Sequence, residues 1–208
     1  MSLEHNSNGC CTGIIVDIDC SDSKDGSSYP ENVPKPKDGC APVNTGARID
    51  EGPGENKEDK FLNYYKDKQV DKSFYKGISK SLDIKESEVA KLTGQDIIKS
   101  VIERRKKGFK IEYHHIRPDW AGGKNEGDNL IPIRRKPDHK GEGSAHRWWN
   151  RKLEDKNKKI QEEINKCLKK NGISKKIKHN KGESGMKKTA KELKKHNLPM
   201  HVCLTECS

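Results

Sequence analysis

Residues 113–150 read YHHIRPDWAGGKNEGDNLIPIRRKPDHKGEGSAHRWWN, and the interpretation of the whole chain depends on this stretch. It contains four of the eight histidines, which are His114, His115, His139 and His146. A neutral imidazole can ligate a metal ion, and the same group can accept a proton near neutral pH. Histidines clustered beside glycine-rich sequence therefore predict a metal site.

The same stretch predicts a short run of secondary structure. Phe109, Ile111 and Tyr113 alternate with polar residues, which is typical of a half-buried strand that ends at the histidine pair. Residues 121–128 are rich in glycine and predict a loop, and residues 129–133 predict a second strand. Ser144 is a suitable N-cap for a helix over 145–170, so His139 is expected to precede that helix. The expected local order is strand, loop, strand, helix.

The flanking sequence between residues 58 and 108 has a helical pattern. Apolar residues predict a helix around 61–65, another around 74–82, and a third that begins after Thr93 and runs to Lys106. Towards the C-terminus the pattern predicts a helix over 186–196 and a strand over 201–205. Together these elements predict an α+β protein, with a mainly helical basic domain over 57–208 and a motif core over 108–170.

Residues 1–56 differ from this body in composition and charge. They contain 4 basic and 10 acidic side chains, whereas residues 57–208 contain 39 basic and 22 acidic ones. Many turn-forming residues and few apolar ones favour an irregular acidic leader or linker. Only residues 13–18 resemble a strand, and a short strand that docks onto the body is the alternative. The basic body favours a polyanionic partner such as nucleic acid, although solvated lysine-rich helix faces account for the charge equally well.

The seven cysteines form no Cys-x-x-Cys pair, so their spacing does not predict a zinc knuckle. Free thiols are the favoured interpretation. Disulfides that link the N-terminal segment to the C-terminal end are the alternative, in an oxidising compartment. The sequence contains no apolar stretch of the ~18 residues that a membrane-spanning helix needs. We therefore expect no membrane span.

The histidine stretch resembles the HNH, or ββα-metal, endonuclease superfamily. The resemblance rests on His114-His115-Ile116, the Gly122-Gly123 loop, residues 129–133 and His139, and it covers about 40 residues. Residues 139–141 and 146–150 are most similar to the nuclease modules of bacterial polymorphic toxins. The resemblance implies a small ββα-metal core.

The resemblance also implies a role for each matched residue. His114, His139 and His146 are expected to bind one divalent metal ion, which is Mg²⁺, Mn²⁺, Ni²⁺ or Zn²⁺. His115 is expected to be the general base, and Asn129 is expected to fix the loop and orient that base. The four residues 141–144 lengthen the gap between the last two histidines, which makes His146 the least secure ligand.

Other side chains near the motif have two interpretations each. Four arginines surround it and either hold phosphates or are solvated charges; these are Arg117, Arg134, Arg135 and Arg147. Trp148 and Trp149 are expected to pack in the core, with nucleobase stacking as the alternative. Asn150 either braces the site or lies exposed on the helix.

Two classes of function fit these features. The first is a metal-dependent, largely sequence-nonspecific endonuclease that cleaves DNA, or RNA, and that is a bacterial toxin or a nuclease of a phage or mobile element. A toxin would be secreted or delivered into a target cell and would have an acidic immunity protein as partner; otherwise a cytoplasmic location is expected. The second is a non-catalytic, metal-stabilised module that binds nucleic acid.

Overall fold

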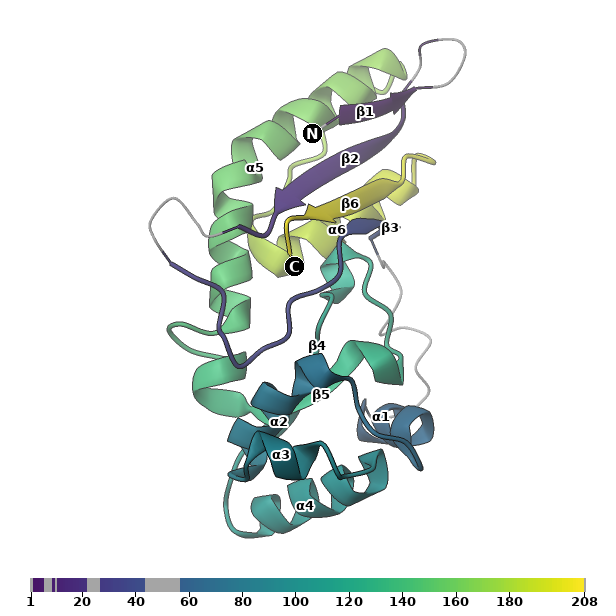
Figure 1. Cartoon of the computed structure of the whole chain (residues 1–208). Helices are drawn as coiled ribbons and strands as arrows, with labels where there is room; N and C mark the ends of the chain where they lie inside the picture. The colour runs from purple at the N-terminus through teal and green to yellow at the C-terminus, as the bar shows by residue number, and fades with distance from the viewer. Residues whose placement is uncertain (1, 6–8, 10, 22–26, 44–56, 208) are drawn as a thin grey trace.

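The computed structural model describes residues 2–5, 9, 11–21, 27–43 and 57–207. Helices and strands occupy separate stretches of the chain in an α+β arrangement, as predicted. A four-stranded sheet with the helices α5 and α6 lies at one end, and the helices α1 to α4 lie at the other, with a two-stranded hairpin near them (Figure 1).

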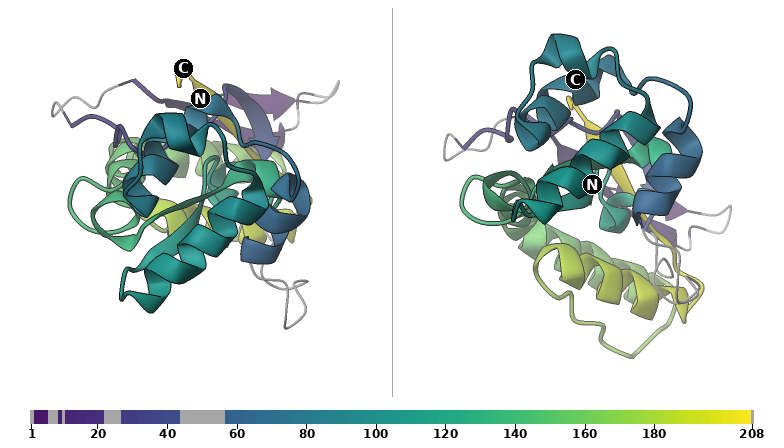
Figure 2. Two further views of the ribbon diagram at one scale, coloured as in Figure 1. Left: turned by 60° about the horizontal axis from the view of Figure 1, so that its bottom comes forward. Right: turned by 90° about the horizontal axis from the view of Figure 1, so that it is seen from below.

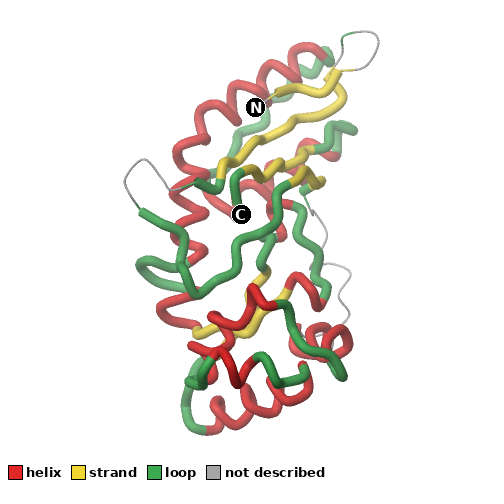
Figure 3. The backbone as a smooth tube through the Cα atoms, viewed as in Figure 1, coloured by secondary structure: helices red, strands yellow, loops and turns green. Residues whose placement is uncertain are grey.

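The four-stranded sheet has the spatial order β1-β2-β6-β3. Its strands are β1 (Ser2–His5), β2 (Cys11–Asp19), β3 (Gly39–Pro42) and β6 (Met200–Thr205). The two central strands are parallel, with Ile14 opposite Met200, and both edge strands are antiparallel to their neighbours. The sheet therefore joins the two ends of the sequence (Figure 3).

The prediction of an irregular segment over residues 1–56 was wrong for the part that the structure describes. That part supplies three of the four strands, and the side chains of Ile14, Val16 and Ile18 are fully buried. Tyr29 is also buried, with its ring 5.1 Å from Trp148 and 5.9 Å from Trp149. The few apolar residues of this segment suffice because β6 and the tryptophans complete their packing.

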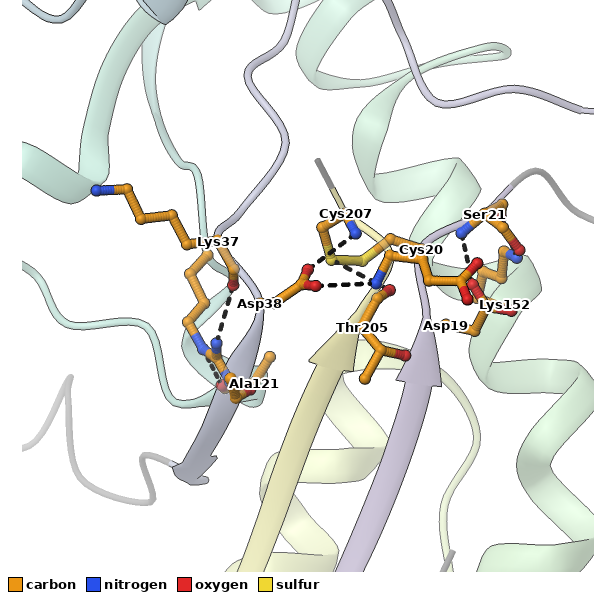
Figure 4. The surroundings of a disulfide bond; sticks show 12 residues. Asp19, Cys20, Ser21, Lys37, Asp38, Ala121, Lys152, Thr205 and Cys207 are labelled. Atoms are coloured by element: carbon orange, nitrogen blue, oxygen red, sulfur yellow. Dashed lines mark hydrogen bonds between the residues drawn. A yellow bond between two sulfur atoms is a disulfide. The ribbon is translucent and has the colours of Figure 1, made fainter.

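Six of the seven cysteines form disulfides, so the favoured prediction of free thiols was wrong for them. The pairs are Cys11–Cys167, Cys20–Cys207 and Cys40–Cys203. Each pair joins the N-terminal segment to the C-terminal part, which was the alternative prediction, and Cys10 lies outside the described residues. The Cys20–Cys207 bond lies at the end of β2. Asp38, directly before β3, accepts the backbone N–H of Cys207 at 2.9 Å and so supports this bond (Figure 4).

Two helices lie against the sheet. Helix α5 (Ala145–Lys170) packs on β2, and α6 (Gly182–Lys194) packs on α5 and β6. Ser144 caps α5 as predicted, since its hydroxyl accepts the backbone N–H of Arg147 at 3.3 Å. Trp148 and Trp149 are buried, which confirms the prediction that they belong to the core.

The hairpin consists of β4 (Ile111–His115) and β5 (Leu130–Arg134), which pair with His115 opposite Leu130. Helix α2 packs on β5, and α1 packs on the loop that joins the two strands (Figure 2, left). The short helices are α1 (Lys57–Tyr65), α2 (Tyr75–Leu82), α3 (Glu86–Val89) and α4 (Gly94–Lys106). Helix α4 begins after Thr93, where Thr93 and Asp96 form the capping box that fixes its start.

The order strand, loop, strand, helix occurs at β4, β5 and α5. Between β5 and α5 the chain makes one short helical turn, η4 (Arg135–His139), so His139 precedes the long helix as expected. No helix in the described ranges is long and apolar enough to cross a membrane.

Candidate metal centre

Three histidines from three different elements meet between the hairpin and α5. His114 lies on β4, His139 ends the η4 turn, and His146 lies in the first turn of α5. One ring nitrogen from each lies within 4.8 Å of the other two, so the three residues are close enough to hold a metal ion. The structure thus brings together the three predicted ligands, here called the histidine cluster, and residues 141–144 do not keep His146 away.

Two carboxylates orient two of these rings. Glu112 accepts a hydrogen bond from His139 Nδ1 at 2.6 Å, and Glu183 accepts one from His146 Nδ1 at 2.9 Å. Because a neutral imidazole carries one proton, a protonated Nδ1 leaves Nε2 with a lone pair. The two Nε2 atoms lie 3.0 Å apart. Two lone pairs that face each other at this distance repel unless a cation or a proton lies between them.

The donor set fits a metal ion in two further respects. Both ring nitrogens of His114 are buried and have no hydrogen-bond partner within the described part of the chain. An unpaired buried nitrogen is costly, and a metal ion would satisfy one of the two. Burial lowers the pKa of His139 to about 4, and the pKa of His114 lies well below its ordinary value because of burial and the two neighbouring histidines. Both rings are therefore neutral at pH 7, as metal ligands must be.

The histidine cluster lies at the wall of a hollow of about 710 Å³, here called the metal pocket. Four lysines also line it, which are Lys57, Lys140, Lys187 and Lys188. Asp119 and Glu183 line the hollow too, so its four ammonium groups exceed its two carboxylates, and this excess positive charge favours anionic ligands over cationic ones.

His115 lines the same pocket but is not part of the histidine cluster. Its Nε2 lies 3.2 Å from Asn125 Oδ1, and its Nδ1 lies 3.3 Å from Lys57 Nζ. An amide oxygen and an ammonium group select the tautomer with the proton on Nε2 and the lone pair on Nδ1. Burial, followed by the nearby charge of Lys57, lowers the pKa of His115 to about 4. His115 is thus a separate, neutral imidazole beside the cluster.

Asn129 fixes the loop between the two strands, as predicted. Its Oδ1 accepts the backbone N–H of Arg117 at 2.8 Å, and its Nδ2 donates to the carbonyl oxygens of Arg117 and Lys124 at 3.0 and 2.8 Å. The second predicted role of Asn129 does not fit, because the amide that contacts His115 belongs to Asn125. Asn129 orients the His115 ring only indirectly, through the loop that carries Asn125.

Several site residues escaped prediction from the sequence. Glu112 lies two residues before His114 on the same strand, and the alternation of side chains in a strand could have identified it. Glu183 lies 37 residues after His146, and no pattern in the neighbouring sequence identifies it as a site residue. It also accepts the Trp120 indole N–H at 2.8 Å, and Asn150 accepts its backbone N–H at 3.1 Å, so Asn150 braces the site. Lys187 forms an ion pair with Asp119 at the pocket wall.

The four arginines near the motif lie in different surroundings. Arg117 donates to four backbone carbonyl oxygens, those of Ala121, Lys37, Gly39 and Val202, which does not fit the predicted contact with nucleic acid. Arg134 forms a two-pronged ion pair with Asp138. Arg135 pairs with Glu112 and Arg147 with Glu142, and about half of each arginine side chain is exposed.

The chain matches no protein-family model, and no curated protein and no solved structure is significantly similar to it. The assignment of a function therefore rests on the histidine motif and on the geometry of the metal pocket.

Proposed function

We propose that this protein is a metal-dependent, largely sequence-nonspecific DNA endonuclease of the HNH type. The observation that carries the proposal is the pairing of a three-histidine cluster with a separate neutral histidine in one lysine-lined pocket. Hydrolysis of a phosphodiester needs a base for the attacking water and a cation at the departing oxygen. A metal ion of the Mg²⁺, Mn²⁺, Ni²⁺ or Zn²⁺ type on His114, His139 and His146 would supply that Lewis acid.

The remaining chemistry belongs to the protein's own residues. His115 Nδ1 carries the lone pair and faces Lys57 Nζ, so it is neutral and available as a base at pH 7. A substrate phosphate in the pocket attracts the Lys57 ammonium away from Nδ1, and a water molecule can then donate its proton there. Asn125 holds the opposite edge of the ring and keeps the proton on Nε2. Glu112 and Glu183 hold the cluster rings in the ligand tautomer.

The number of available ligands favours an enzyme over a structural metal site. Structural zinc is usually closed by four protein ligands, whereas a catalytic ion keeps one position open. Among the described residues, only His114, His139 and His146 place three ligand atoms within 4.8 Å of one another. This count supports hydrolysis over the alternative of a non-catalytic module that binds nucleic acid.

A nicking assay tests the proposal directly. Oxidised, purified protein is incubated with supercoiled plasmid and Mg²⁺, Mn²⁺, Ni²⁺ or Zn²⁺, with EDTA as a blank. We expect nicking with at least one ion and a loss of about 10²–10⁴-fold in His115→Ala, the usual range for a general base. His196→Ala, outside the pocket, is the matched control. Metal-dependent stabilisation without nicking, or full activity in His115→Ala, would instead support the structural module.

The biological setting that we propose is a toxin that is secreted or delivered into a target cell. The three disulfides support it, since such bonds persist in oxidising compartments. An acidic immunity protein that covers the lysines of the metal pocket is the expected partner. Lethality on expression in a bacterium, relieved by the product of a neighbouring gene, tests this setting; harmless expression would favour a phage or mobile-element nuclease.

A further inference from the structure

A second hollow lies at the open end of the hairpin, where Ile111 pairs with Arg134. Its volume is about 420 Å³, and it is distinct from the metal pocket. The residues that line it are Phe109, Lys110, Arg134, Arg135, Lys136 and Lys140. Five of these six side chains are cationic and the sixth is aromatic, so the hollow combines the two chemistries that bind a nucleotide.

The aromatic side chain is unusually accessible. Phe109 is 46% exposed, although burial of a phenyl ring is favourable. The Arg104 guanidinium lies 3.6 Å from the ring centroid and covers it from one side. This stacking holds the ring in place at the wall of the hollow. An aromatic ring that is fixed and exposed is a suitable platform for a planar base.

The cations of the hollow are only partly neutralised. Arg134 is paired with Asp138, and Arg135 and Lys140 share Glu112 at 3.3 Å each. Within the described residues, Lys110 and Lys136 have no acidic partner, and both are exposed. Two unpaired lysines beside the ring leave room for a phosphate.

Two residues connect this hollow to the metal pocket, Lys140 and Glu112. Lys140 lines both hollows. Glu112, which holds the His139 ring at 2.6 Å, also contacts Arg135 and Lys140. A strand whose phosphate lies at the histidine cluster can therefore continue past Lys140 to Phe109.

We propose that the second hollow is a subsite for one unpaired nucleotide of the substrate strand. Phe109 stacks the base, and Lys110 and Lys136 hold its phosphate. An unpaired nucleotide is required because a base within a duplex already stacks on both faces. The link to the metal pocket rests on the proposed nuclease function, but the binding chemistry of the hollow does not depend on it.

Binding of a single-stranded 12-mer DNA with one central 2-aminopurine tests the proposal. The measurement is made in EDTA, so that cleavage and metal play no part. We expect Phe109→Ala to weaken binding about 5- to 100-fold and to abolish the stacking-induced quenching of 2-aminopurine. Phe109→Leu, which keeps apolar bulk without a ring, should behave like Phe109→Ala. Lys110→Ser should weaken binding and reduce the slope of log K against log salt by about 0.7.

Tyr64→Ala is the matched control. Tyr64 is 41% exposed and has the Lys68 ammonium 3.9 Å from its ring centroid, so it resembles Phe109 but lines neither hollow. Its variant should bind the 12-mer like the unmodified protein. Affinity for a blunt duplex of equal length should change less than threefold in Phe109→Ala.

Three results would overturn the subsite. The first is a single-strand affinity that does not change in Phe109→Ala. The second is a loss of affinity in Tyr64→Ala as large as that in Phe109→Ala. The third is that poly-glutamate displaces the 12-mer from the unmodified protein but not from Phe109→Ala. Nicking activity with unchanged single-strand binding would reject the subsite and leave the nuclease proposal intact. Single-strand stacking without nicking would support the subsite and reject the nuclease.

Discussion

The sheet end of the molecule and the hairpin end are held together in different ways. In the sheet, β2 pairs with β6, which lies at the other end of the sequence, and three disulfides join the N-terminal segment to α5, β6 and the residue Cys207 after β6. In the hairpin, β4 and β5 are separated by one loop, and short helices from neighbouring sequence cover them. The described residues contain no disulfide in this second region. Pairing of distant segments costs more chain entropy, and the cross-links offset that cost.

The candidate metal centre lies where these two regions meet. His114 and Glu112 belong to the hairpin, whereas His146 and Glu183 belong to the helices that cover the sheet. The comparison implies that the site depends on both regions, although only one of them is cross-linked.

The largest expected effect is the loss of a disulfide from the sheet region. Cys11 and Cys167 lie 156 residues apart in the sequence, and loss of a native disulfide usually costs about 2–5 kcal/mol. We expect the Cys11→Ser/Cys167→Ser protein to unfold at lower denaturant concentration. In hydrogen exchange, β2 and β6 should lose more protection than β4 and β5. Equal loss in both regions would show that they unfold as one unit.

The next effect concerns the two carboxylates that orient the cluster. Removal of such a partner usually weakens metal affinity 10- to 100-fold, or about 1.4–2.8 kcal/mol. We expect this loss in Glu112→Gln, from the hairpin, and in Glu183→Gln, from α6. Zinc titration with a competing chelator measures it. Glu192→Gln, on the exposed face of α6, is the control. If Glu112→Gln weakened metal affinity and Glu183→Gln did not, the orientation of the cluster would depend on the hairpin alone.

The sequence predicted the parts of the molecule that depend on local signals. Thr93 and Ser144 cap the helices α4 and α5 at the expected positions, and the three cluster histidines follow from the motif. Long-range features were missed. β1, β3 and the cysteine pairs depend on segments that only folding brings together, and Glu183 reaches His146 from another helix. Asn125 was missed because Asn129, in the same loop, carried the stronger family signal.

A smaller effect is expected from acid in the sheet region. His179 is 5% exposed, and burial lowers its pKa to about 4 from the ordinary value of 6.5. Between these pH values the unfolded chain binds more protons than the folded one, so stability falls as pH decreases from 6.5 to 4. At about 1.36 kcal/mol for each pKa unit, we expect this group to contribute about 2 kcal/mol of lost stability between pH 7 and pH 5. Urea unfolding at pH 7, 5 and 4 measures it.

The control for this acid effect is His179→Gln, which should lose that part of the pH dependence while His114 and His139 keep theirs. His201→Gln, at a partly buried position on the central strand β6, should follow the unmodified protein. If the unfolding free energy of His179→Gln had the same pH dependence as that of the unmodified protein, the acid sensitivity would belong to the metal centre.

The smallest effect tests the joint between the two regions. Arg117 lies in the hairpin loop, yet it donates to the carbonyl oxygens of Gly39 and Val202 in the sheet. A lysine cannot donate to four carbonyls at once, so Arg117→Lys should lose about 1 kcal/mol of unfolding free energy. Arg147→Lys, whose exposed ion pair is weak, should lose less than about 0.5 kcal/mol.

A double-mutant cycle shows whether Arg117 transmits the effect of the cross-links. Cys40–Cys203 joins the two strands whose carbonyls Arg117 binds. If the disulfide positions those carbonyls for Arg117, then Arg117→Lys should cost less in the Cys40→Ser/Cys203→Ser background, with an interaction energy of at least ~0.5 kcal/mol. Additive losses would mean that the hairpin loop contacts the sheet without depending on its cross-links, and the metal centre would then tolerate reduction of that disulfide.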